Sequence, residues 1–114
     1  MTPLAELRAQ EHGDVAVAAI VGEVDASNAG ELGAGLRELV SNRSTRLVVD
    51  LSPTRYLDSA GINLLFSLGQ ELRAHQVGLA LVIDPSSQVA RMLSLTGLDK
   101  ANPTYATLAD ALAS

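Results

Sequence analysis

Residues 47–72, LVVDLSPTRYLDSAGINLLFSLGQEL, join an apolar run to an amphipathic one through a short loop. The run LVVDL at 47–51 has the nearly continuous apolar character of a strand buried on both faces of a sheet. After Ser59, apolar residues recur at helical spacing, namely Ile62, Leu65, Phe66, Gly69 and Leu72. This stretch predicts a buried strand, a loop that contains Pro53, and a helix that begins near Ser59.

Two further apolar runs of the same kind flank this segment along the chain. VAVAAIV at 15–21 and LALVI at 79–83 also have the composition of strands buried in a parallel sheet. Shorter edge strands are expected at residues 4–8 and 101–105. Because these strands alternate with helical patterns, we predict an α/β fold with a mostly parallel sheet.

Capping residues mark the other predicted helices. The first begins around 25–28, where Asn28 and Glu31 have the spacing of a capping box. The third opens at 85–87 and ends before Gly97, which suits the left-handed position beyond a helix end. The last runs from Thr107 to 112.

Composition places the chain among small single-domain proteins that can bury a real core. The 114 residues, 47% hydrophobic and 18% charged, fit a single domain over 1–114. The net charge of -5 opposes nucleic acid and anionic membranes as partners. There is no cysteine, and the N-terminal residues have no signal-peptide pattern. We expect a soluble cytoplasmic protein, with no metal and no cofactor because no binding motif for either is present.

Two catalytic interpretations are weak. A hydrolase would need a base near Ser59, but His12 falls in a polar N-terminal loop and His75 at the far end of the predicted helix, about 24 Å away. Asp50, at the end of a strand, could be the phospho-acceptor of a receiver domain. However, Glu23 and Asp25 are not adjacent as its acidic pair would be, and Lys100 is not placed after a strand. We therefore predict that the chain is not an enzyme.

Ser59 admits two interpretations. In the simpler one, Asp58 or Ser59 caps the helix and contributes about 1 kcal/mol. In the other, Ser59 accepts a phosphate, which would add about -1.5 to -2 charges at a helix N-terminus that favours anions. Because Asp58 and Asp25 are also acidic, such a charge could abolish a binding surface without disturbing the fold.

Three segments together carry a resemblance to a known family. They are GEVDASNAGEL at 22–32, LVVDLSPTRYLDSAGINLL at 47–65 and SSQVARMLSLTGL at 86–98. In this order and spacing they resemble a STAS domain, and more narrowly a bacterial anti-anti-sigma factor (anti-sigma factor antagonist). The resemblance covers about residues 14–113 and implies a small mixed, mostly parallel sheet with about four packed helices.

The resemblance also implies a function. The unphosphorylated protein would bind an anti-sigma factor that is also a serine kinase of the histidine-kinase-like ATPase fold, and so free a sigma factor. Phosphorylation of Ser59 by that kinase would release the antagonist, and a PP2C-type phosphatase would restore it. The implied partner surface comprises Asp25, Ser27, Asp58, Ser59, Ala60 and Gly61.

One residue of this chain departs from the family pattern, and the family also has members with another role. Many members have a second hydroxyl residue where this chain has Ala60, which leaves Ser59 as the acceptor in that segment. Other STAS proteins are scaffolds of stress-sensing complexes or subunits of transport complexes whose serine is not phosphorylated. That role is the alternative to the phosphorylation switch.

Overall fold

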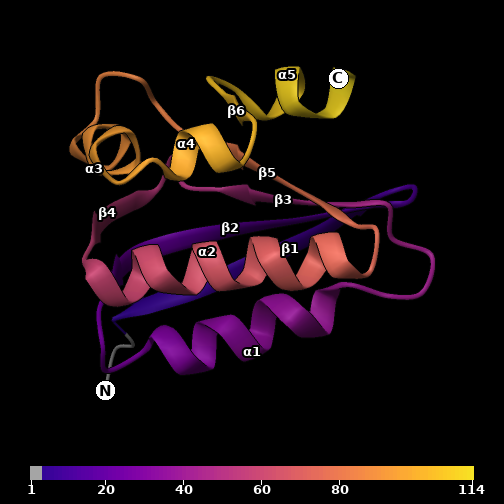
Figure 1. Ribbon diagram of the computed structural model, residues 1–114, viewed down its shortest axis with the longest axis horizontal. Helices are drawn as coiled ribbons and strands as arrows, with labels where there is room; N and C mark the ends of the chain where they lie inside the picture. The colour runs from indigo at the N-terminus through magenta and orange to yellow at the C-terminus, as the bar shows by residue number, and fades with distance from the viewer. Residues whose placement is uncertain (1–3) are drawn as a thin grey trace.

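The computed structural model describes residues 4–114, which form six strands and five helices (Figure 1). The strands are β1 (Ala5–His12), β2 (Val15–Val24), β3 (Arg46–Asp50), β4 (Thr54–Leu57), β5 (Gly78–Val82) and β6 (Thr104–Tyr105). The helices are α1 (Ala29–Leu39), α2 (Ser59–Ala74), α3 (Gln88–Thr96), α4 (Leu98–Ala101) and α5 (Leu108–Ala113). About four helices were predicted, and the additional one is α4, a single turn that directly follows Gly97.

The strands form one mixed sheet in which parallel pairing dominates, as predicted. Its order is β1-β2-β3-β5-β6, and β4 also pairs with β2. Only β1 is antiparallel to its neighbour among these strands of residues 4–114. β2 is long enough to pair in parallel with β3 over Val15–Ala19 and then with β4 over Gly22–Val24. The carboxyl ends of β2 and β4 therefore lie side by side.

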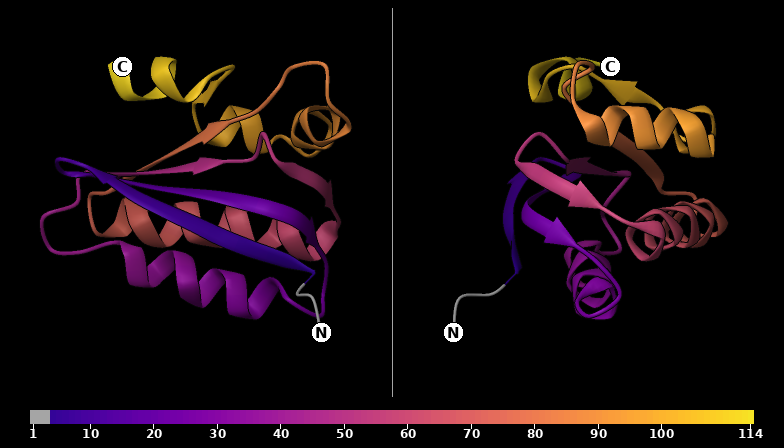
Figure 2. Two further views of the ribbon diagram at one scale, coloured as in Figure 1. Left: turned by 180° about the vertical axis from the view of Figure 1, so that it is seen from behind. Right: turned by 90° about the vertical axis from the view of Figure 1, so that its left-hand side faces the viewer.

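Helices cover both faces of the sheet unequally. Side chains alternate along β2, so that Ala16, Ala18 and Ile20 join one core while Val15 and Val17 join another. The first core also includes buried residues of α1, α2, α3 and α4. The second is covered by α5, which contributes Ala111. Figures 1 and 2 show α1 and α2 side by side against one face, with α5 at the far end of the molecule.

The structure corrects two expectations about loops. β1 extends to His12 and turns into β2 through Gly13 and Asp14, so His12 ends a strand and does not lie in a polar loop. The loop predicted around Pro53 contains β4, a four-residue strand with buried ends and an exposed middle. Because its burial does not alternate with period two, the residues of β4 lack the pattern that predicts a strand.

Capping predictions are confirmed at both ends of α3 and at the start of α5. The Ser87 hydroxyl accepts a hydrogen bond from the Ala90 N–H at 3.1 Å. Gly97 adopts a left-handed conformation with φ of 81°. The Thr107 hydroxyl accepts from the Asp110 N–H at 3.1 Å.

Candidate functional site

The predicted site residues come together where β2 and β4 end. Val24 pairs with Leu57 in the sheet, and the Asp58 N–H donates to the Val24 carbonyl at 3.2 Å. Asp25 and Asp58, which come next in the two strands, therefore lie on neighbouring segments at the same edge. This edge also carries the first turns of α1 and α2, which lie close together in Figure 2.

Asp58 is the N-cap of α2. Its Oδ1 accepts hydrogen bonds from the N–H groups of Ala60 at 2.9 Å and Gly61 at 3.3 Å. Ser59 is the first residue of the helix and is exposed, and its hydroxyl makes no hydrogen bond within residues 4–114. The choice between Asp58 and Ser59 as the cap is thus decided for Asp58, which leaves the Ser59 hydroxyl without a structural task.

The loop before α1 is held by side-chain hydrogen bonds. Asp25 Oδ1 accepts from the backbone N–H of Ser27 at 2.8 Å and from its hydroxyl at 2.5 Å. These bonds, the hydroxyl first, lower the pKa of Asp25 because they stabilise its charged form. Asp25 therefore presents a fixed carboxylate, and Ser27 serves to orient it.

Asn28 corrects the predicted capping box. It is the N-cap residue of α1, but its side chain makes no capping hydrogen bond. Instead, Asn28 Oδ1 accepts from the Asp25 N–H at 3.0 Å, and Asn28 Nδ2 donates to the Glu23 carbonyl at 2.9 Å. The amide thus ties the end of β2 to the start of α1, a role that spacing alone could not distinguish from capping.

Two glycines permit close packing beneath the site. A Cβ on Gly61 would lie 2.4 Å from Leu57 Cδ1 and 3.1 Å from Val24 Cγ1, so the first turn of α2 sits directly on the two strand ends. Gly22 has φ of 120°, and a Cβ there would lie 2.3 Å from the Leu4 carbonyl oxygen. Between Gly22 and Glu23 the pairing register of β2 and β4 shifts, as at a β-bulge, just before the loop that carries Asp25.

Thr54 is a site-supporting residue that the sequence did not reveal. Its side chain is buried, and its hydroxyl donates to the Ile20 carbonyl at 2.7 Å. The bond fastens β4 to β2 just before the segment that leads to Ser59. A polar residue after Pro53 suggested only a loop, because nothing local indicates its partner 34 residues away.

The charge of this edge is predominantly negative. Asp25 and Asp58 follow the two strands, and Glu23 lies near the end of β2, two residues before Asp25. Arg55 approaches Glu23 at 3.6 Å, but both side chains are largely exposed, so the pair contributes little. A further negative charge at Ser59 would therefore enlarge an existing acidic patch.

The residues that the two catalytic interpretations require do not come together in the structure. His75 caps the end of α2, 16 residues from Ser59. Asp50 pairs with Ala19, six residues before Asp25 and so roughly 20 Å from it along β2. Lys100 lies in α4. Within residues 4–114, no group of three metal-ligating side chains occurs, and no helix has the length and apolarity to cross a membrane.

Comparisons with known proteins show the family and the fold. The STAS domain family model matches residues 6–111. The anti-sigma-F factor antagonist RsfB of Mycobacterium tuberculosis is 35% identical over 103 residues, which cover 90% of this chain and 82% of that protein. A crystal structure of an anti-sigma factor antagonist from Mycobacterium paratuberculosis has a TM-score of 0.85 and 32% identity, covering 96% of this chain and 92% of the other.

A more distant structure shares the fold. Bacillus SpoIIAA in its unphosphorylated form has a TM-score of 0.76 with 20% identity, and the match covers 94% of this chain and 93% of SpoIIAA. The predicted fold class is therefore confirmed.

Proposed function

This chain belongs to the STAS domain family, and we propose that it is an anti-sigma factor antagonist whose activity is switched off by phosphorylation of Ser59. The antagonist role rests on two relatives with that name, which share about a third of their residues with this chain over nearly its whole length. Its partner is then an anti-sigma factor. Binding that factor frees a sigma factor for transcription.

One observation carries the phosphorylation switch. Asp58 supplies the cap of α2, so the exposed Ser59 hydroxyl can be modified without losing a hydrogen bond that holds the fold. A phosphate at this position would meet the positive end of the helix dipole, which limits its cost to stability. The same phosphate would add about -1.5 to -2 charges beside Asp58 and Asp25. The fold is then preserved while the binding face changes its charge.

The contact face proposed for the partner is the edge where β2 and β4 end. It consists of Asp25, Ser27, Asp58, Ser59, Ala60 and Gly61. The fixed carboxylates of this face favour a partner surface with basic groups. Phosphorylation of Ser59 would add further negative charge to this face. The side chain at Ala60 is small, so it leaves the Ser59 hydroxyl accessible to a kinase.

The proposed kinase is the anti-sigma factor itself, a serine kinase of the histidine-kinase-like ATPase fold. In the transfer, the Ser59 oxygen forms a bond to the γ-phosphorus of ATP, the bond from that phosphorus to ADP breaks, and the hydroxyl proton passes to a base on the kinase. A PP2C-type phosphatase would hydrolyse the phosphoserine and restore the binding face. This chain serves as a substrate in both steps.

The test uses purified anti-sigma factor kinases from the organism that encodes this chain. After incubation with ATP and Mg²⁺, intact mass and peptide mapping should find one phosphate, on Ser59. Ser59→Ala should still bind the kinase but should not be phosphorylated or released by ATP. Phosphate on that variant would move the acceptor elsewhere, for example to Ser52.

Affinity measurements separate the switch from a passive scaffold. Ser59→Asp should bind the kinase at least tenfold more weakly than the wild type by calorimetry, or about 1.4 kcal/mol. Equal affinities of the wild type and Ser59→Asp, together with no phosphorylation, would instead favour a STAS scaffold or subunit of a stress-sensing or transport complex.

A further inference from the structure

A groove of about 250 Å³ runs between β4 and α3. This β4–α3 groove is lined by Arg55, Tyr56, Leu57, Gln88, Val89, Arg91 and Met92. Leu57 directly precedes Asp58, so the groove is continuous with the proposed contact face. Figure 2 shows α3 lying lengthwise across the same side of the molecule that carries β4 and the start of α2.

Two exposed apolar side chains lie in or near the groove. Tyr56 is 51% exposed and Leu95 is 77% exposed, and they are two of the three large hydrophobic side chains exposed within residues 4–114. Leu95 lies three residues after Met92 on α3, so the two side chains are neighbours on the helix surface. They continue the apolar strip beyond the groove. Apolar side chains gathered at one edge indicate an interaction surface.

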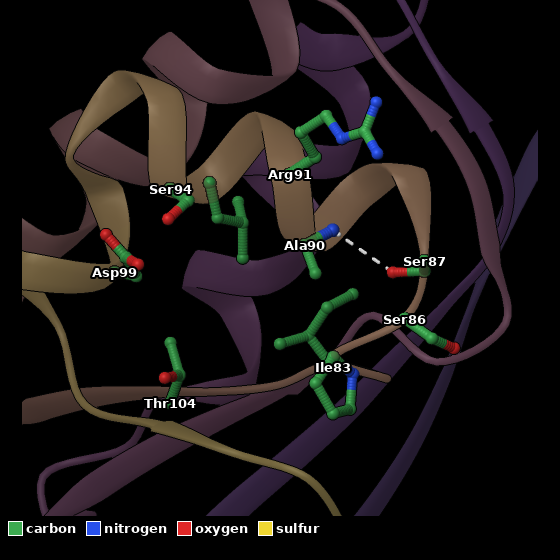
Figure 3. Close-up of a pocket in the computed structure, with 10 residues that line it drawn as sticks. Ile83, Ser86, Ser87, Ala90, Arg91, Ser94, Asp99 and Thr104 are labelled. Carbon is green, nitrogen blue, oxygen red and sulfur yellow. Dashed lines mark hydrogen bonds between the residues drawn. The ribbon is translucent and has the colours of Figure 1, made fainter.

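The groove also holds a positive charge available for a partner. Most arginines of this chain bond internally, such as Arg37 with Glu71 and Arg46 with the Ala111 carbonyl. Arg91, by contrast, makes no ion pair within residues 4–114. Arg91 also borders a larger hollow with Ser94 and Thr104, but Figure 3 shows its guanidinium directed away from those two residues.

We propose that the β4–α3 groove docks a segment of the anti-sigma factor kinase that presents an acidic side chain beside an apolar one. The acidic side chain pairs with Arg91, and the apolar one packs on Tyr56 and Met92. This proposal rests on the proposed function, since it names a second contact of the same partner. The two contacts have opposite charge. Phosphorylation weakens the contact at Ser59, whereas the groove contact keeps the substrate on its kinase and lowers the KM for its phosphorylation.

The test is charge reversal with a matched control. Arg91→Glu and Arg43→Glu change the net charge equally, but Arg43 lies before β3, at the opposite end of the sheet. Arg91 is exposed and sits in the first turns of α3, where a glutamate is tolerated by the helix dipole. Circular dichroism and urea unfolding should confirm that both variants fold. Leu95→Ser provides a second, uncharged probe, of the apolar surface beside the groove.

The measurements are the affinity of each variant for the kinase and the KM and kcat of Ser59 phosphorylation. Arg91→Glu should weaken binding and raise the KM, each at least tenfold, while kcat stays within twofold of the wild type. Leu95→Ser should weaken binding and raise the KM at least threefold. Arg43→Glu should change both by less than twofold. Wild-type values for both groove variants would overturn the docking proposal while the phosphorylation switch stands. No binding of the wild type to any of the kinases would overturn both. A wild-type dimer by light scattering that becomes a monomer in both groove variants would assign the groove to a second copy and also overturn the proposal.

Discussion

Replacing Gly61 by alanine tests how tightly α2 is seated on the strand ends that carry the site. The added Cβ would lie 2.4 Å from Leu57 Cδ1, whereas ordinary contacts begin near 3.4 Å. Leu57 must therefore shift by about 1 Å. Leu57 is 2% exposed and Val24, 3.1 Å from the same Cβ, is fully buried, so little space is available for this movement.

The magnitude follows from two opposing effects. Overpacking of a close-packed core costs about 1–3 kcal/mol. Alanine regains up to about 1 kcal/mol of helix propensity, and less in a first turn than in a helix interior. The net expectation is a loss of about 1–2 kcal/mol in the free energy of unfolding. In a domain of this size, that corresponds to a decrease in Tm of about 4–8 °C.

The matched control is Gly30→Ala, because Gly30 also lies in the first turn of a helix. A Cβ there meets no atom within 4 Å, so only the propensity gain remains. Urea unfolding should therefore show Gly61→Ala below and Gly30→Ala at or above the wild-type stability. Equal stabilities of the two variants would refute the claim that α2 is packed against Leu57 and Val24 without spare volume.

Two further predictions concern the carboxylates of the site. Asp58→Ala should lower the free energy of unfolding by about 1 kcal/mol because the N–H groups of Ala60 and Gly61 lose their acceptor. Asp58→Asn should lower it by less than half of that amount. Urea unfolding measures both variants. Asp25 has a lowered pKa in the folded state, so its contribution to stability is present above the unfolded pKa and is lost as the pH falls below about 4. Ser27→Ala removes the main cause, so a carbon-13 NMR titration should find the pKa of Asp25 raised toward its usual value; an unchanged pKa would assign the shift to another group.

The elements with long apolar patterns were predictable from the sequence. The buried strands β2, β3 and β5 and the helix stripe of α2 follow from local periodicity, and Gly97 and Thr107 marked helix ends by their conformational and capping preferences. Ser59 and Asp58 were recognisable because strand-to-helix loops at the carboxyl end of a parallel sheet are the usual position of sites.

The features that the sequence did not predict depend on residues far away in the chain. β4 forms because its backbone pairs with β2 and the Thr54 hydroxyl donates a hydrogen bond to β2, about thirty residues earlier in the chain. Asn28 has the spacing of a capping residue, but its Oδ1 accepts from the Asp25 N–H instead of from a helix N–H, and its Nδ2 donates to the Glu23 carbonyl. The groove beside α3 required the packing of β4, so the exposure of Tyr56 could not be foreseen.

The double pairing of β2 has a consequence for local unfolding. β2 has hydrogen-bonded neighbours on both sides, with β1 on one and β3 followed by β4 on the other, whereas β4 pairs only with β2 among the strands of residues 4–114. Amide protons of β2 should therefore exchange with solvent most slowly, and those of β4 should exchange through openings that leave the rest of the sheet intact. Ser59 follows a strand with one hydrogen-bonded neighbour, whereas Asp25 follows a strand with neighbours on both sides. A modification at Ser59 can thus change the frequency of local opening at one edge without reducing the global stability of the domain.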